Sequence, residues 1–88
     1  MRFGWNAAKN ATNIRERGID FAFAVAAFDA LTVTFEDVRK AYTERRFISY
    51  GYINGRLYVL VWTPRETDAL TWIISARKAN ARESKKYG

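Results

Sequence analysis

The stretch RRFISYGYINGRLYVLVWT, residues 45 to 63, indicates that the second half of the chain is built from antiparallel strands. At its centre is Asn54-Gly55, a dipeptide well suited to a type I′ turn because both central residues of that turn need a positive φ. The flanking runs, RRFISYGYI and RLYVLVWT, are rich in aromatic and β-branched residues, as strands are. A two-residue loop at this point fixes the register of the hairpin, so that Ser49 faces Leu60.

The remaining segments predict helices before this hairpin and a strand and a helix after it. Helical spacing and capping residues indicate helices over 6–18, capped by Asn6 and Gly18, and over 20–28. Short strands are expected over 2–5, 31–36 and 70–76, and Pro64 is expected to end the second strand of the hairpin. Asn80 with Glu83 starts a short basic helix that ends near Tyr87. We therefore expect one α+β domain over residues 1–88: a short N-terminal strand, two helices, a twisted four-stranded antiparallel sheet and a short C-terminal helix.

Composition excludes several kinds of chemistry. The 88 residues can hold only one core, and they include no cysteine and no histidine, which removes thiol nucleophiles and metal sites that depend on imidazole or thiolate. Any catalytic acid or base must therefore be Lys, Arg, Tyr, Asp or Glu, and we expect no cofactor and no metal. The longest apolar run, LYVLVW, is too short to cross a bilayer, so we expect a cytoplasmic protein without a membrane partner.

Positive charge is concentrated in the second half of the chain. The net charge is +6; residues 1–44 carry six basic and six acidic side chains, whereas residues 45–88 carry nine basic and three acidic ones. A basic surface attracts polyanions, and on nucleic acid it gains affinity from counterion release. A lysine-rich surface that only keeps the protein soluble is the alternative.

The hairpin register gathers a first polar cluster at one end of the sheet. It places Glu44 and Arg46 on the same face as Thr63 and Arg65, with Glu44 opposite Arg65. Guanidinium groups bind phosphate oxygens in pairs, so the cluster can hold a phosphate that Glu44 helps to orient. A cross-strand salt bridge on the surface, without a function, explains the same residues equally well.

A second cluster, formed by Ser75, Arg77 and Lys78, lies where the last strand ends. Antiparallel pairing puts Arg77 about 20 Å from Arg65, at the opposite end of the sheet. The terminal helix can bring Lys85, Lys86 and Tyr87 to either end. Two simpler readings stay open: charges that keep a strand end soluble, and lysines that suit a helix C-terminus.

Three parts of the chain carry motifs that are specific in their order and spacing. They are the opening pattern, the segment ERRF and the motif IISARKA with two later residues: Phe3, Trp5, Lys9, Asn10, Asn13, Ile14, Gly18, Ile19, Phe21, Glu44 to Phe47, Ile73 to Ala79, Glu83 and Tyr87. Together these motifs resemble the BrnT family of toxins from type II toxin-antitoxin systems, and the resemblance covers essentially the whole chain.

This resemblance implies a RelE-like fold and a toxin that cuts RNA without metal and inhibits translation. Such cleavage needs a base for the 2′-OH proton, cations for the phosphate and an acid for the leaving oxygen. On this reading Lys78, Glu44 and Tyr87 are the candidates for base or acid, and Arg46, Arg65 and Arg77 for phosphate clamps. Further contacts to RNA are expected from Arg45, Thr63, Ser75, Arg82, Lys85 and Lys86.

The resemblance also implies a partner. BrnT toxins are neutralised by a BrnA-type antitoxin with a ribbon-helix-helix domain, which implies a heterotetramer of two toxins and two antitoxins that contacts operator DNA through the antitoxin. A non-catalytic RNA- or protein-binding module that uses the same basic face is the alternative function. Charge alone does not separate the two.

Overall fold

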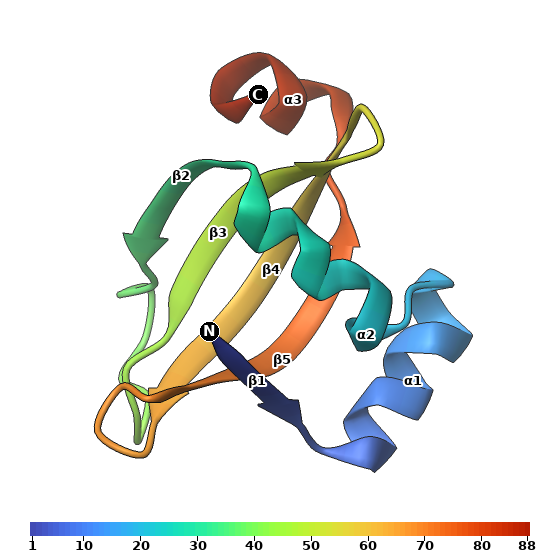
Figure 1. The fold of residues 1–88 in the computed structure, drawn as a ribbon. Helices are drawn as coiled ribbons and strands as arrows, with labels where there is room; N and C mark the ends of the chain where they lie inside the picture. The colour runs from blue at the N-terminus through green and yellow to red at the C-terminus, as the bar shows by residue number, and fades with distance from the viewer.

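The computed structural model, which describes residues 1–88, is a single sheet with helices packed on it (Figure 1). In chain order the elements are β1 (Arg2–Trp5), α1 (Ala7–Arg17), α2 (Phe21–Ala24), the 3₁₀ helix η1 (Val25–Asp29), β2 (Leu31–Glu36), β3 (Phe47–Ile53), β4 (Arg56–Arg65), β5 (Leu70–Lys78) and α3 (Ala81–Tyr87). The strand order is β1-β5-β4-β3-β2. β1 runs parallel to β5, and the other neighbours are antiparallel. The predicted α+β class is confirmed, with the N-terminal strand added to make a mixed five-stranded sheet.

α1 lies beside the β5 edge of the sheet (Figure 1). Asn6 caps it by accepting a hydrogen bond from the Lys9 N–H, and Gly18 ends it with a φ of 70°. The one buried residue of the helix is Asn13, whose amide nitrogen donates to the Ala76 carbonyl at 2.9 Å and whose oxygen accepts from the Ala76 N–H at 3.2 Å. β1 pairs with β5 only as far as Ile73, so Asn13 takes the place of a strand partner for the edge beyond it.

α2 and η1 cross one face of the sheet and make the main core with it (Figure 1). Phe21, Ala24 and Ala27 are fully buried there against strand residues such as Leu60. The approach is so close that a Cβ at Gly51 would collide with the Ala27 carbonyl, so only glycine fits at that position. The helix predicted over 20–28 is therefore present, with its second half tightened to 3₁₀ geometry.

The central hairpin has the predicted turn and register. Asn54 and Gly55 have φ values of 49° and 79°, and Ser49 pairs with Leu60. β3 begins at Phe47, however, two residues later than the sequence suggested, because its pairing with β4 reaches only as far as Trp62.

Pro64 does not end the long strand, contrary to our expectation. β4 continues to Arg65, and Pro64 pairs with Thr71 of β5. Since β3 stops pairing at Trp62, β4 has one neighbour at this point, and a residue without an N–H is tolerated there. The expected turn follows, in a left-handed backbone conformation at three successive residues: Glu66, Thr67 and Asp68.

α3 lies near the Asn54-Gly55 end of the sheet (Figure 1). It packs on Tyr50 and Val59, which point to the opposite face from Leu60 and the core under α2. It begins with the predicted capping box, in which Asn80 and Glu83 each accept a hydrogen bond from the other's N–H, at 2.8 and 3.0 Å. Tyr87 packs against a second buried cluster that includes Tyr50 and Val59. None of the three α-helices is long and apolar enough to cross a membrane.

We expect Asn13→Ala to lower the free energy of unfolding by about 2 kcal/mol or more. The substitution leaves buried backbone groups of Ala76 and Ile19 without a hydrogen-bond partner, and each such group costs about 1 to 3 kcal/mol. Urea unfolding measures the change. Arg15→Ala, an exposed position on the same helix, is the control and should stay within about 0.5 kcal/mol. Equal effects of the two substitutions would show that Asn13 does not fasten α1 to the sheet.

Candidate active site

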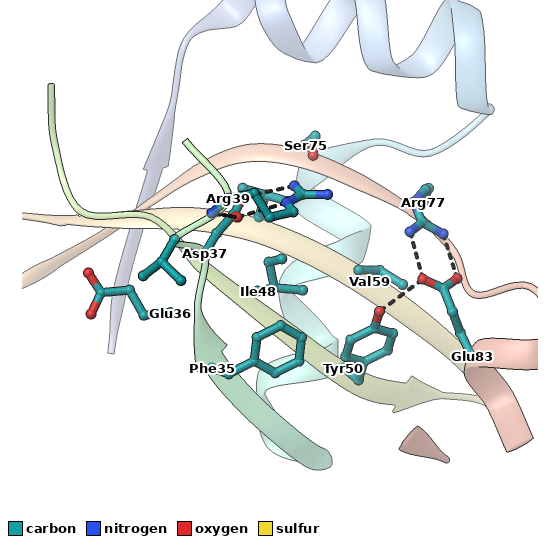
Figure 2. Close-up of a pocket in the computed structure, with 12 residues that line it drawn as sticks. Phe35, Glu36, Asp37, Arg39, Ile48, Tyr50, Val59, Ser75, Arg77 and Glu83 are labelled. Atoms are coloured by element: carbon teal, nitrogen blue, oxygen red, sulfur yellow. Dashed lines mark hydrogen bonds and ion pairs between the residues drawn. The ribbon is translucent and has the colours of Figure 1, made fainter. Parts of the chain in front are cut away.

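The face of the sheet that α2 leaves uncovered carries a cleft of about 510 Å³ (Figure 2). Its floor is apolar and includes Ile48, Val59 and Val61 of the two central strands. One wall comes from α3, and the opposite wall comes from the segment that follows β2. Charged and hydroxyl side chains from these walls and from the strands also line the cleft: Glu36, Asp37, Arg39, Tyr50, Ser75, Arg77 and Glu83.

Arg77 is the cation at the α3 end of the cleft. It lies opposite Val59 in the β4–β5 pairing, and its guanidinium donates to both carboxylate oxygens of Glu83, at 2.7 and 2.8 Å (Figure 2). The Tyr50 hydroxyl donates to the same carboxylate at 2.9 Å. Glu83 is also the capping-box residue of α3, so one carboxylate fixes the helix start, the arginine and the tyrosine together.

These contacts set the protonation states at this end of the cleft. The hydrogen bonds from Arg77 lower the pKa of Glu83 to about 2, against the opposing effect of burial. Burial raises the pKa of Tyr50 to about 12, and the hydrogen bond to Glu83 acts in the same direction. At neutral pH the cleft therefore holds a carboxylate, a protonated phenol and a guanidinium.

A second arginine, Arg39, comes from the opposite wall. It donates to both oxygens of Asp37, each at 2.8 Å, and the Tyr42 hydroxyl donates to the same carboxylate at 2.9 Å. These hydrogen bonds, those of Arg39 first, hold the pKa of Asp37 well below its usual range. The Asp37 side chain is buried, whereas that of Arg39 is 75% exposed, so the arginine is anchored and still open to a ligand.

Sequence reasoning missed Asp37 and Arg39. The signal was present as an Asp-x-Arg spacing directly after the 31–36 strand. Nothing in that spacing shows that the loop turns back across the sheet, which is what brings Arg39 to the cleft that contains Arg77.

The structure divides the other predicted site residues among several places. Ser75 lies in the cleft with Arg77, whereas Lys78 pairs with Tyr58 and so points to the other face of the sheet. Tyr87 stacks on Tyr50 with ring centroids 4.4 Å apart. Thr63 is buried, Arg45 pairs with Glu36 on the surface, and the remaining cations of α3 are exposed: Arg82, Lys85 and Lys86.

The first predicted cluster forms at the far end of the same face. Glu44 reaches Arg65 at 3.6 Å, the contact that was predicted, although Glu44 precedes β3 and is not paired with β4 there; both line a separate depression together with Arg46. The two basic clusters therefore stay apart, as the spacing along the strands predicted. No group of three or more carboxylates lies close enough together to hold a metal ion.

A family model for the BrnT ribonuclease toxin of type II toxin-antitoxin systems matches residues 5–83. The chain belongs to this family. The match covers most of the chain and includes both the Arg77 cleft and the Arg65 depression. A comparison with curated proteins found no match.

Membership of the BrnT family decides between the two functions that the sequence left open. The family is one of ribonucleases, so the protein is an RNA-cleaving enzyme and not only a binding module. As a type II toxin it has RNA as its substrate and an antitoxin as its partner.

The shifted pKa of Glu83 predicts a pH dependence of stability. In the unfolded chain this carboxyl has its ordinary pKa of 4.5, and in the folded protein a pKa of about 2. Its contribution to stability is therefore complete above about pH 4.5 and is lost as the pH falls toward about 2. We expect the difference in free energy of unfolding between the protein and Glu83→Gln to shrink over that interval. Urea unfolding at a series of pH values measures it, and a difference that is constant with pH would contradict the assigned ion pair.

Proposed function

We propose that RNA is cut in the cleft between Arg77 and Arg39. The observation that carries this proposal is the bidentate ion pair between Arg77 and the Glu83 carboxylate, which lies beside an open cleft. A carboxylate and a phosphate present similarly spaced oxygens to a guanidinium, so the same donors suit an RNA phosphate. Arg39 supplies a second guanidinium from the opposite wall.

The reaction proposed is attack of a ribose 2′-oxygen on the adjacent phosphorus. Glu83 takes the proton of the 2′-OH while the bond from the 2′-oxygen to phosphorus forms. The bond from phosphorus to the 5′-oxygen breaks, and the Tyr50 hydroxyl gives that oxygen a proton. Glu83 then returns its proton to Tyr50 across their 2.9 Å hydrogen bond, so the enzyme is restored and the products are a 2′,3′-cyclic phosphate and a 5′-hydroxyl.

Binding of the phosphate makes Glu83 a better base. The first cause of its low pKa is the pair of hydrogen bonds from Arg77. When phosphate oxygens take over these donors, the pKa of Glu83 rises toward its ordinary value, and the carboxylate gains affinity for a proton at the moment one must be removed. The pKa of Tyr50, about 12, keeps the phenol protonated at neutral pH, so a proton is present for the 5′-oxygen.

The two arginines serve the transition state more than the ground state. Negative charge builds on the phosphate oxygens as the 2′-oxygen attacks, and fixed donors above an apolar floor stabilise that charge. This arrangement supplies the charge stabilisation from the protein's own side chains, and we propose that cleavage proceeds without a metal ion.

We expect Arg77→Ala to slow cleavage of a single-stranded RNA by about a hundredfold or more, and Arg77→Lys to restore only part of the rate, because lysine keeps the charge and loses the paired donors. Rates are measured with EDTA present. Arg15→Ala, on the outer surface of α1, is the control, and thermal unfolding confirms that each variant is folded.

If the Arg77→Ala protein is folded and cuts RNA as fast as the parent, the cleft is not the site of cleavage. Loss of the parent's activity in EDTA would instead show that a metal is required. Lys78→Ala, one residue further on, separates the two faces of β5: because Lys78 points away from the cleft, we expect a much smaller effect than at Arg77.

We also propose that this enzyme inhibits translation and is silenced by a BrnA-type antitoxin with a ribbon-helix-helix domain. The basis is the resemblance to BrnT toxins together with the exposed cations of the second half of the chain. Such a domain is a dimer, so it gathers two toxins and two antitoxins into a heterotetramer and links the toxin to operator DNA only through the antitoxin.

Light scattering on the co-purified complex tests the assembly. We expect the mass of two toxins and two antitoxins, held constant as the complex is diluted across the micromolar range. A complex that stays at one toxin and one antitoxin at high concentration would refute the heterotetramer. Protection of Lys85 and Lys86 from acylation, with Lys9 still reactive, would place the antitoxin on α3.

A further inference from the structure

The depression at the far end of the open face, about 550 Å³ in volume, carries an excess of positive charge. Lys9 of α1, Arg46 of the 37–46 loop and Arg65 of β4 line it, and Glu44 is the one carboxylate among the lining residues. Lys9 and Arg46 take part in no salt bridge, and Glu44 reaches Arg65 only at 3.6 Å. Most of the positive charge in the depression is therefore not neutralised by the protein itself.

Two buried polar atoms in this part of the sheet have no hydrogen-bond partner: Nε of Arg46, which lines the depression, and Oγ1 of Thr63, which does not line it. Thr63 is 1% exposed and lies two residues before Arg65 on the same face of β4. Arg46 is held by the face of the Tyr42 ring, 4.3 Å from the ring centroid, and not by a carboxylate. Buried polar groups are normally hydrogen-bonded, so Arg46 is unusual in lining the depression without a carboxylate or a hydrogen-bond partner for its Nε in the protein.

The same depression offers a flat surface on which a base can stack. The guanidinium of Arg65 lies 4.2 Å from the centroid of the Trp72 ring, and Trp72 is itself a lining residue. Aromatic rings and guanidinium planes are the surfaces on which proteins stack unpaired RNA bases. A cation and a stacking surface at one spot match one phosphate and its neighbouring base.

The depression and the Arg77 cleft lie along one side of the sheet. Arg77 pairs with Val59, six residues along β4 from Arg65, a separation of about 20 Å. On β4, Val61 lines the cleft, and Arg65, four residues further on and on the same face, lines the depression. One extended strand of RNA can therefore lie across both.

We propose that Lys9, Arg46, Arg65 and Trp72 form a second, non-catalytic subsite for single-stranded RNA, which holds a phosphate and stacks the adjacent base some nucleotides away from the cleavage point. This proposal rests on the proposed function in that it places the scissile phosphate at Arg77. It gives Arg65 and Arg46 a role in substrate length and affinity and leaves the bond-making step to the Arg77 cleft.

The test is a binding measurement by fluorescence anisotropy with labelled 2′-O-methyl RNA, which lacks the attacking hydroxyl. We expect Arg65→Ala to weaken binding of an octanucleotide about tenfold, to reduce the slope of log affinity against log salt by about 0.7, and to leave binding of a dinucleotide within about twofold. Trp72→Leu should weaken octanucleotide binding about tenfold with the salt slope unchanged, because it removes stacking and no charge. Arg15→Ala is the charge-matched control and should change neither.

Three results would overturn the proposal. Equal losses for the dinucleotide and the octanucleotide would place Arg65 in the cleavage site, and no loss for either would remove it from the RNA path. Unchanged RNA affinity with loss of antitoxin binding would assign the cluster to the partner instead. The two proposals can fail separately, because the binding probe cannot be cleaved. Normal RNA cleavage by Arg77→Ala would refute the proposed function, whereas octanucleotide binding that depends on Arg65 and Trp72 would still support the subsite.

Discussion

The ion pair between Arg77 and Glu83 joins the fold to the chemistry proposed here. Glu83 completes the capping box at the start of α3, and its bond to Arg77 fastens that helix to the sheet. Tyr50 hydrogen-bonds the same carboxylate, and the Tyr87 ring stacks on Tyr50, so the wall of the cleft is one connected unit. The pair also keeps a strong cation at the surface in a fixed orientation. Breaking it costs the protein a helix anchor, and exchanging Glu83 for a phosphate gives Arg77 a new partner of the same charge.

The two faces of the sheet have different roles: one buries the main core, and the other carries the cleft. This separation explains how so short a chain holds both. One face buries the main core under α2 and η1, where small residues and Gly51 allow close packing. The other face is bordered by α3 and by the segment that follows β2, and its central strands present an apolar floor between two groups of cations. Charges above an apolar surface interact more strongly than charges in open water. Asp37 contributes by anchoring Arg39 without filling the cleft.

The sequence predicted what depends on local geometry and left out what depends on how separate segments meet. The caps at Asn6 and Asn80 and the Asn54-Gly55 turn each follow from a few neighbouring residues, and all three are present. The separation of Arg65 from Arg77 also followed, because strand register converts sequence distance into space. The ion pair between Arg77 and Glu83 could not be predicted in this way, since the position of a short helix against a sheet is decided by tertiary packing. The two faces of β5, which divide Arg77 from Lys78, could have been read from the alternation of a strand.

The exchange of partners at Arg77 is the central claim, and the pKa of Glu83 reports on it directly. Carbon NMR on protein labelled at glutamate carboxyls follows this titration with and without bound 2′-O-methyl RNA. The account predicts a pKa of about 2 in the free protein and a clear rise toward 4.5 in the complex, as phosphate displaces the carboxylate from Arg77. A pKa that stays the same when RNA binds would show that Arg77 keeps Glu83 as its partner, and would contradict the mechanism.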